Sequence, residues 1–355
     1  MNKSILYIGN IIDRISSGAD MVNQSNLSVI TDIFKDQFFS VGLGEPNFYE
    51  KFCLYTGGCT KRICDDILNV IQKESISIVF LSSSLLGKLA KQIKKSFPRI
   101  VIISFCHNIE SVYAKEEVKV SGIRKIPSFL TMSYNEYLTI KYSDKIIVLN
   151  QRDNALLNKY YKRIADLICP IVCEDKYKTL GVKTINDTKF VTLFVGTAFF
   201  ANVEGIKWYI DNVKPYTDDL LIIVGKGMDK YQTIWEKDNI KVYGFVDDLS
   251  IYYNNADAVI LPIFHGGGMK TKTAEAFMYG KLVVGSTEAF QGYDNLKESF
   301  AIRCNDAESF ISTINQLSKN TNFEKFNKES RAYYLNNNTY QSHYKRFKSL
   351  FDTII

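Results

Sequence analysis

The sequence predicts an α/β protein made of two doubly wound parallel-sheet domains that face a cleft. Three observations lead to this prediction. The chain has 355 residues, more than a single hydrophobic core usually supports. Short apolar runs alternate with longer amphipathic segments, a pattern typical of buried parallel strands joined by helices. The alternation stops once, just after Cys173, and then starts again.

In the first half, the short apolar runs have the length of buried strands, and the segments between them have the period of helices. The predicted strands are Ser4–Ile8, Ser77–Leu81, Arg99–Phe105 and Lys145–Leu149, and the predicted helices are Arg62–Lys73, Leu85–Phe97 and Arg152–Ile164. These elements predict an amino-terminal domain over residues 1–174.

A polar stretch without a clear period follows Cys173 and contains Gly181, so residues 175–188 form the predicted linker. The second domain is predicted over 189–330. Its strands are expected at Phe190–Val195, Leu220–Val224, Ile240–Tyr243, Ala258–Leu261 and Leu282–Val284, and its helices near Gly205–Asn212, Asp248–Asn254 and Thr271–Tyr279. The tyrosine-rich segment 331–355 is expected to be helical and to pack back, with the first domain as the favoured partner.

Composition and charge exclude several classes of protein. The net charge of +6 is spread along the chain, which disfavours nucleic-acid binding and suits an anionic small molecule or a membrane surface. The seven cysteines form no C-x-x-C pair and the three histidines stand far from the cysteine clusters, so we expect no structural metal. No apolar run has the length of a membrane span or a signal peptide, which predicts a cytoplasmic protein.

The stretch from Ile260 to Tyr293 carries the strongest functional signal. An apolar run ending at Leu261 predicts a strand, Gly266–Gly268 free the backbone for a close approach, and good helix formers follow from Thr271 to Tyr279. The start of a helix after such a loop presents backbone N–H groups and the positive end of the helix dipole. The order strand, glycine loop, helix therefore predicts an anion site.

The charges in this stretch support a diphosphate ligand. Lys270 and Lys272 lie at the helix start, where acids are normally preferred, and Glu275 lies one turn deeper. Without a bound anion, the two lysines are repelled by the positive end of the helix dipole. A bound diphosphate would neutralise both. The alternative is a surface helix on which Lys272 and Glu275 form an exposed pair of little energetic value.

Glycine-containing loops follow several predicted strands of the second domain. In an open α/β sheet, ligands bind beyond the carboxyl ends of the strands. A nucleotide-shaped ligand is therefore predicted at this edge, in contact with the loops 196–202, Gly225-Lys226-Gly227, Gly244-Phe245-Val246 and Gly266–Lys272.

These residues resemble a known family. The run Gly268-Met-Lys-Thr-Lys-Thr-Ala-Glu-Ala-Phe-Met-Tyr-Gly280 looks like the donor-domain signature of glycosyltransferase family four, whose members have two Rossmann-like domains (the GT-B fold). Asn202 with Gly205, the Gly225 turn and the segment Gly244–Asp257 resemble that family in the same order. In the first domain the resemblance is limited to His107-Asn-Ile-Glu110 and the strand after Asp144.

The resemblance implies a nucleotide-sugar-dependent glycosyltransferase. It places Glu275 on the ribose hydroxyls, Lys270 and Lys272 near the diphosphate, and the Gly266–Gly268 amides near the sugar. The implied donor-binding set is Asn202, Gly225, Lys226, Gly244, Phe245, Val246, Gly266, Gly267, Gly268, Met269, Lys270, Lys272 and Glu275.

His107 and Glu110 are the candidate catalytic residues of the first domain. The resemblance implies that His107 faces the transferred sugar, where it would orient the sugar or accept a proton. The simpler interpretation of His107 is a histidine bonded to nearby backbone, and that of Glu110 is a cap of the following turn.

The chain departs from the family at Gly267, where a second glutamate is usual. This departure motivates an alternative, a non-catalytic subunit that binds nucleotide or glycan and supports a partner transferase. No D-x-D sequence is present, so we expect a metal-independent reaction. Retention at the sugar carbon is expected rather than inversion, on the family resemblance. An ester hydrolase built on His265-Gly-Gly-Gly268 lacks a G-x-S-x-G elbow, and a nicotinamide enzyme lacks G-x-G-x-x-G after the first strand.

The expected acceptor is a glycan or a lipid-linked acceptor in surface polysaccharide synthesis. The helix Leu85–Phe97 has lysines on one face and leucines and isoleucine on the other, which suits peripheral contact with the inner face of an anionic membrane. The alternative is a solvated lysine face over a packed core.

Overall fold

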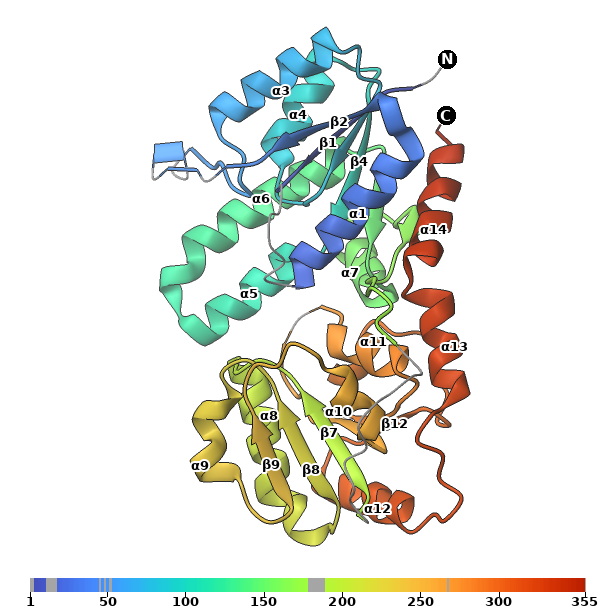
Figure 1. The fold of residues 1–355 in the computed structure, drawn as a ribbon. Helices are drawn as coiled ribbons and strands as arrows, with labels where there is room; N and C mark the ends of the chain where they lie inside the picture. The colour runs from blue at the N-terminus through green and yellow to red at the C-terminus, as the bar shows by residue number, and fades with distance from the viewer. Residues whose placement is uncertain are drawn as a thin grey trace. The chain divides into compact units, whose positions relative to one another are not determined.

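The computed structural model describes residues 3–10, 18–44, 46–47, 49–50, 53–177, 189–266 and 268–354. The chain divides into two compact units, Met1–Pro170 with His343–Ile355, and Ile171–Ser342 (Figure 1). Each unit is built around one parallel sheet with helices on its faces, which confirms the predicted α/β architecture. Most of the predicted linker, from 178 to 188, lies outside the described residues.

The first unit contains a six-stranded sheet in the order β2-β1-β3-β4-β5-β6. The sequence analysis predicts its inner strands but not the edge strands β2 and β6. These two are only partly buried, so they lack the continuous apolar run that marks a strand covered on both faces. The strands are β1 (Ile5–Gly9), β2 (Phe38–Gly42), β3 (Ile78–Leu81), β4 (Val101–Cys106), β5 (Lys145–Val148) and β6 (Leu167–Ile168).

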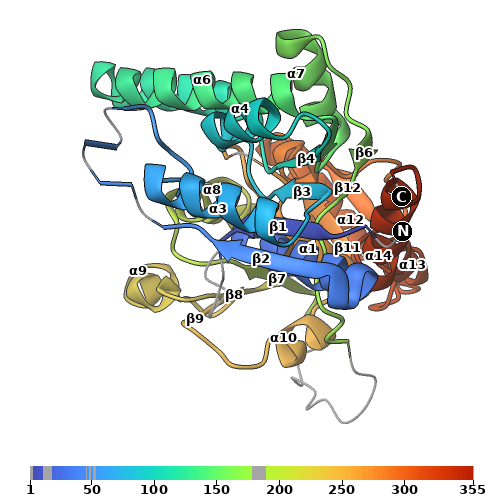
Figure 2. The same ribbon diagram turned by 90° about the horizontal axis from the view of Figure 1, so that it is seen from above.

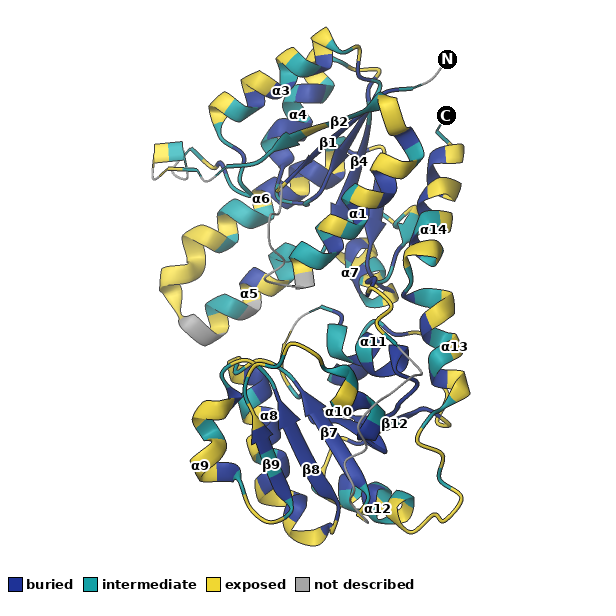
Figure 3. Cartoon of the chain, in the orientation of Figure 1, coloured by how far each residue is buried: buried dark blue, intermediate teal, exposed yellow. Residues whose placement is uncertain are grey.

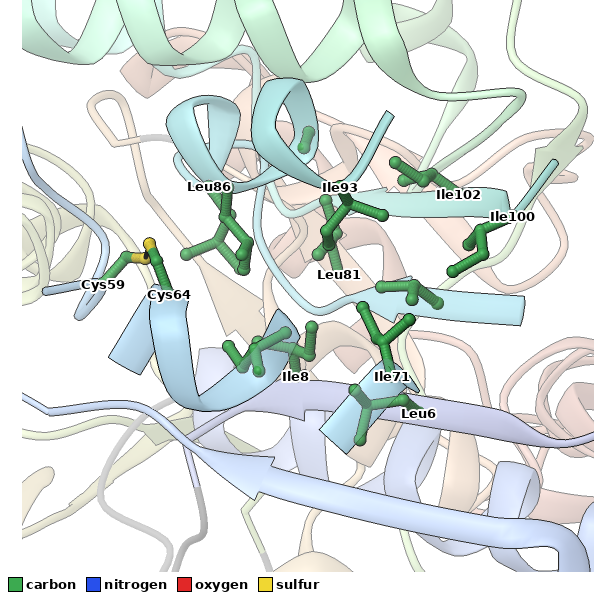
Figure 4. Packing of buried hydrophobic residues seen from close by; sticks show 14 of the residues in the cluster. Leu6, Ile8, Cys59, Cys64, Ile71, Leu81, Leu86, Ile93, Ile100 and Ile102 are labelled. Carbon is green, nitrogen blue, oxygen red and sulfur yellow. Dashed lines mark hydrogen bonds between the residues drawn. The ribbon is translucent and has the colours of Figure 1, made fainter. Parts of the chain in front are cut away.

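Helices cover both faces of this sheet, because successive side chains of a strand point to opposite faces. Leu6 and Ile8 of β1 pack with Leu81, α3 and α4 in one core (Figure 4). Tyr7 points the other way and stacks on Phe80. The helical segments are α1 (Gly18–Phe34), η1 (Lys35–Gln37), α3 (Lys61–Lys73), α4 (Gly87–Ser96), α5 (Glu110–Ser121), η2 (Ile123–Lys125), α6 (Ile126–Tyr142) and α7 (Gln151–Tyr161).

The carboxyl-terminal helix α14 (Tyr340–Asp352) packs on the first unit from His343 onward, as predicted. Its Phe351 ring lies 4.9 Å from Phe34 of α1, and its Phe347 ring lies 6.0 Å from Phe80. The predicted helical segment is not continuous, because α13 (Lys328–Asn337) ends before α14 begins. Residues up to Ser342 belong to the second unit.

His343 anchors α14 through a buried hydrogen-bond network. Its Nδ1 lies 3.0 Å from the Cys169 sulfur and its Nε2 lies 2.8 Å from the Asn26 side-chain oxygen. Burial lowers the pKa of His343 to about 3, and Arg346 acts in the same direction. The ring is therefore neutral at pH 7.

The second unit contains a six-stranded sheet in the order β12-β11-β10-β7-β8-β9. This is the strand order of dinucleotide-binding domains. Successive strands are added on one side of β7 as far as β9, and from β10 onward they are added on its other side. All but the short edge strand β12 are predicted by the sequence. The strands are β7 (Val191–Val195), β8 (Leu220–Val224), β9 (Ile240–Tyr243), β10 (Ala258–Leu261), β11 (Leu282–Gly285) and β12 (Ala301–Arg303).

The three helices predicted near 205–212, 248–254 and 271–279 are present, whereas the helical segments between Met228 and Trp235 and the helix Ala307–Ser318 are not predicted. A close approach fixes α8 against the sheet, since a β-carbon at Gly205 would lie only 1.9 Å from the Pro262 carbonyl oxygen. The helical segments are α8 (Phe200–Asn212), η3 (Lys214–Tyr216), η4 (Met228–Tyr231), α9 (Gln232–Trp235), α10 (Ser250–Asn255), α11 (Thr271–Met278), η5 (Glu288–Phe290), α12 (Ala307–Ser318) and α13.

The helix at 85–97 uses its apolar face inside the protein. Leu89, Ala90 and Ile93 of α4 are buried in the first core. Lys94 forms an ion pair with Asp144, and only the lysine-bearing face of α4 reaches the surface. The apolar face is therefore not available to a membrane. Within the described residues, no helix is long and apolar enough to cross a bilayer.

The His343 network predicts acid-sensitive folding. Below pH 6.5, the ordinary pKa of the ring, the unfolded chain binds a proton at His343 while the folded chain does not until about pH 3. The free energy of unfolding should therefore fall as pH drops through this window, by up to about 1.4 kcal/mol per pH unit from this group. Urea unfolding at several pH values measures the slope. His343→Gln should have the shallower slope and the exposed control His265→Gln should match the wild type; equal slopes for His343→Gln and wild type would contradict the account.

Candidate functional site

The candidate site lies at the carboxyl edge of the second sheet, where β7 and β10 are neighbours. The loops that leave these two strands run in opposite directions, which opens a crevice at the switch point. The loop after β7 leads into α8, and the loop after β10 contains the glycine run and leads into α11. The predicted donor-binding residues of these two loops therefore come from neighbouring strands.

Helix α11 begins at Thr271, with Lys270 as its N-cap residue. Lys270 makes no side-chain cap hydrogen bond, in contrast to Asn150 at α7 and Asp306 at α12. Two ammonium groups, from Lys270 and Lys272, thus accompany the positive end of the helix dipole. The predicted conflict between charge and dipole is present in the structure.

Lys270 is held by a residue that the sequence analysis does not identify. Its Nζ donates hydrogen bonds to the Glu288 carboxylate at 2.7 Å and to the Gly268 carbonyl at 2.9 Å. Glu288 lies in η5, after β11, and both partners of this ion pair are largely buried. An acid lying 18 positions further along the chain therefore offsets part of the charge at the start of α11.

Lys272 contacts the loop after β7 across the switch point. Its Nζ donates a hydrogen bond to the Asn202 side-chain oxygen, while the Asn202 amide nitrogen donates to the Thr197 carbonyl at 2.9 Å. Burial lowers the pKa of Lys272 to about 8, and Lys270 adds to this effect while Glu275 opposes it. A buried ammonium with a lowered pKa gains strongly from a second negative partner.

Glu275 lies one turn into α11 and receives a hydrogen bond from a buried tyrosine. The Tyr253 hydroxyl donates to its carboxylate at 3.4 Å, and the Tyr253 ring stacks on Tyr279. Burial raises the pKa of Glu275, and Lys176, Lys272 and Tyr253 act in the opposite direction. Tyr253 is a second residue that the sequence analysis does not identify as part of this site.

Gly225 has a structural reason of its own to be glycine. A β-carbon there would lie 1.8 Å from the Gly196 carbonyl oxygen, so the loops after β7 and β8 touch through their backbones. Lys226 accepts a hydrogen bond from Ala198 through its carbonyl, and its side chain is exposed. Gly244 packs against Asp229. These contacts position the loops after β7, β8 and β9. They give Gly225 and Gly244 a structural role and provide no evidence on ligand binding.

Aromatic side chains are exposed near the start of α8 and after β9. Phe199 and Phe200 stand side by side with ring centroids 4.5 Å apart, and both are more than half exposed. Phe245 in the loop after β9 is 71% exposed, and Val246 beside it is half-buried. Large exposed aromatic rings at a sheet edge are unusual in a packed domain and suit stacking on a flat ligand.

The glycine loop takes a backbone conformation that favours glycine. Gly266 and Gly268 have φ values of 131° and 68°. Gly267, the departure from the family pattern, lies outside the described residues. Met269 is buried and so supports the loop from beneath.

In the first unit, His107 follows β4 directly. Its Nε2 lies 3.0 Å from the Ser82 carbonyl oxygen and 3.0 Å from the Asn23 side-chain oxygen. Since a carbonyl can only accept, Nε2 carries the hydrogen and Nδ1 is the acceptor nitrogen of the neutral ring. Burial lowers the pKa of His107 to about 4, although the Ser82 bond and Asp20 oppose this.

Glu110 is the first residue of α5, but it does not cap this helix. The carboxylate at the helix start belongs to Glu136 of α6, which is fully buried and accepts the Glu110 and Ser111 backbone N–H groups at 2.6 and 3.0 Å. Tyr161 donates to the same carboxylate at 2.6 Å. Burial raises the pKa of Glu110 to about 7, with added effect from Glu136 and Asp153 and an opposing bond from Asn108.

The described residues contain no group of three or more His, Cys, Asp or Glu side chains arranged to hold a metal ion. All seven cysteines are free thiols. In the second unit, Lys270 and Lys272 both lie at the start of α11, beside the switch point of the sheet. A carboxylate at Glu275 and exposed aromatic rings lie on the same unit.

Comparison with known proteins agrees with this geometry. Residues 189–320 match the family described as glycosyl transferases group 1. No curated protein sequence matches the chain. Similar solved structures include sucrose-phosphate synthase from Thermosynechococcus elongatus, with a TM-score of 0.71 and 13% identity over 99% of both chains. Anabaena Alr3699/HepE in complex with UDP has a TM-score of 0.71 and 12% identity over 99% of this chain and 100% of its own.

The lipopolysaccharide outer core galactosyltransferase WaaB has a TM-score of 0.69 and 13% identity, and the match covers 99% of this chain and 100% of WaaB. At such identities the likeness establishes the fold, and the family match is limited to residues 189–320 within the second unit. The sheet orders, the loops at the switch point and these matches show that the chain has the GT-B fold and that its residues 189–320 match the glycosyl transferases group 1 family.

Proposed function

We propose that this protein is a glycosyltransferase that moves a sugar from a nucleoside diphosphate sugar to a glycan or lipid-linked acceptor. The observation that carries the proposal is the convergence of Lys270 and Lys272 on the uncapped start of α11, beside the switch point of the sheet. A diphosphate supplies the negative charge that this position lacks. Glu288 holds the Lys270 ammonium in place. When the ligand binds, a phosphate oxygen would replace Glu288 as the partner of this ammonium.

The remaining parts of the donor fit the surrounding residues. We assign the ribose hydroxyls to Glu275, whose carboxylate is kept in place by Tyr253. The base has aromatic surfaces available at Phe245 and at the Phe199–Phe200 pair. HepE, a structural relative, has been solved in complex with UDP and with UDP-glucose, which supports a nucleotide of this general kind.

The reaction needs stabilisation of the departing nucleoside diphosphate. Two ammonium groups and the helix dipole can provide it without a metal ion, because preorganised charges in a partly dry site act strongly on charge that develops in the transition state. The family resemblance favours retention at the sugar carbon. WaaB acts in the lipopolysaccharide outer core, and a role in surface polysaccharide synthesis is part of the proposal.

The first unit contributes His107 and Glu110 in this proposal. His107 is neutral at pH 7, so Nδ1 can accept a hydrogen bond from a sugar hydroxyl or a proton from the acceptor. Glu110, with a pKa of about 7, exchanges a proton easily near neutral pH. Which of the two residues handles the acceptor proton depends on the stereochemical course.

Nucleoside diphosphates are expected to raise the melting temperature of the chain. At a ligand concentration of about 100 times Kd, the increase should be about 5–10 °C. Lys270→Ala and Glu275→Ala should each abolish most of the shift, while Lys207→Ala, which changes an exposed lysine of α8, should keep it. Absence of a shift with every nucleotide tested would count against the proposal.

His107→Ala is expected to lower kcat by roughly 100-fold or more without changing nucleotide affinity, because the nucleotide is held by the second unit. Donor hydrolysis or transfer by the purified chain, together with a nucleotide titration, measures both quantities. Transfer by the chain alone excludes the alternative of a non-catalytic supporting subunit. An unchanged kcat in His107→Ala would remove His107 from the reaction.

A further inference from the structure

Helices α5 and α6 form a hairpin that exposes apolar side chains in an unusual concentration. Its outer end is largely exposed in Figure 3. Ile123, in the connection between the two helices, is 80% exposed, and Leu130 is 58% exposed. Scattered exposed apolar residues need no explanation, but a contiguous set on one element marks an interaction surface. The exposed set is Tyr113, Ile123, Ile126, Leu130, Tyr134 and Tyr137.

On α6 this set forms a single stripe at helical spacing. Ile126, Leu130, Tyr134 and Tyr137 follow one another at intervals of three and four residues, which places them on one face. The opposite face carries the buried residues, among them Asn135, Glu136 and Leu138. Helix α6 therefore has a buried face of mixed polarity toward the protein and an apolar stripe on its exposed face.

Basic side chains flank the stripe at both ends. Arg124 and Lys125 precede Ile126, and Lys141 follows, with its Nζ 5.7 Å from the Tyr137 ring. Lys115 and Lys119 of α5 are also exposed. Of the acidic side chains described on the hairpin, Glu117 pairs with Lys125, Glu136 is buried and Glu110 is half-buried. Among the described side chains, the exposed charge beside the stripe is therefore mainly positive.

We propose that the α5–α6 hairpin docks on a bilayer surface that contains anionic lipid. Helix α6 would lie in the plane of the interface, with Ile126 and Leu130 among the acyl chain ends. The tyrosines would lie at the headgroup level, where amphipathic rings are favoured, and Arg124 and Lys141 would reach lipid phosphates. Apolar side chains interleaved with basic ones favour a lipid surface over a second copy of the chain, since two copies would bring their positive charges together.

This surface differs from the one that the sequence pattern of 85–97 suggests. The apolar residues of α4 are buried in the core, so α4 can offer a membrane only lysines such as Lys91 and Lys95. The hairpin offers both the apolar and the basic component. Docking of the hairpin does not depend on the identity of the acceptor.

Co-sedimentation of the full chain with lipid vesicles tests the proposal. Binding is expected to phosphatidylcholine vesicles that contain phosphatidylglycerol, and only weakly to phosphatidylcholine alone. Raising the salt from about 0.1 M to about 0.5 M should weaken the binding without abolishing it. The double variant Ile123→Ser/Leu130→Ser should lower the partition coefficient by about tenfold or more.

Matched variants separate the components. Arg124→Gln/Lys141→Gln should reduce binding to anionic vesicles to the level seen with phosphatidylcholine, while Ile164→Ser, at another exposed apolar residue of the first unit, should have no effect. Lys91→Gln/Lys95→Gln tests α4 in the same way. If a hairpin variant unfolds, an environment-sensitive dye attached at Ile123→Cys should still shift its emission to the blue on anionic vesicles.

Some results would overturn the proposal. These are absence of wild-type binding, full binding by the hairpin variants, or loss of binding only in the α4 variant. Light scattering that shows a dimer which Ile123→Ser/Leu130→Ser dissolves would assign the stripe to a second copy instead.

Discussion

The structure of the second unit depends on how positive charge is accommodated at the start of α11. The amino-terminal end of a helix is positive, and side chains of Lys270 and Lys272 add two ammonium groups to it. Glu288 neutralises one of them, and Asn202 supplies only a neutral oxygen to the other. The close packing of the loops at Gly196 and Gly225 keeps these groups at the switch point. This imbalance of charge is the reason that we propose an anionic ligand at the start of α11.

In the first unit, the positive end of helix α5 is neutralised by a side chain of the protein itself. At the start of α5, the buried Glu136 carboxylate accepts two backbone N–H groups and a tyrosine hydroxyl. That helix end is satisfied from within the protein and has no need of a ligand. Glu136 also fixes the turn that carries Glu110 and raises the pKa of its carboxyl. The start of α5 is thus neutralised by a buried carboxylate, whereas the start of α11 has no side-chain cap and is the position that we propose for the ligand.

Much of this organisation follows from the sequence, and the exceptions have physical reasons. Inner parallel strands such as β8 and β10 are buried on both faces, so their uninterrupted apolar runs identify them. The edge strand β2 is half exposed and gives no such run. The α5–α6 hairpin is missed because its apolar residues face outward as well as inward, which removes the one-sided period of an ordinary surface helix.

The candidate site likewise has features that the sequence predicts and features that it does not. The glycine loop and the two lysines at the start of α11 are local in sequence, and their order after a strand can be predicted from the sequence alone. Glu288 and Glu136 act on residues 18 and 26 positions away, so their roles appear only when the chain is folded. Local spacing identifies a charged helix start, while tertiary contacts decide whether that charge is already neutralised.

A crystal structure of the chain with a bound nucleoside diphosphate tests the central claim most directly. The account predicts phosphate oxygens within hydrogen-bond distance of Lys272 and the first-turn amides of α11, the ribose at Glu275, and Lys270 moved from Glu288 to the ligand. A nucleotide bound elsewhere, or bound at α11 while Lys270 remains on Glu288 and Lys272 makes no phosphate contact, would contradict it.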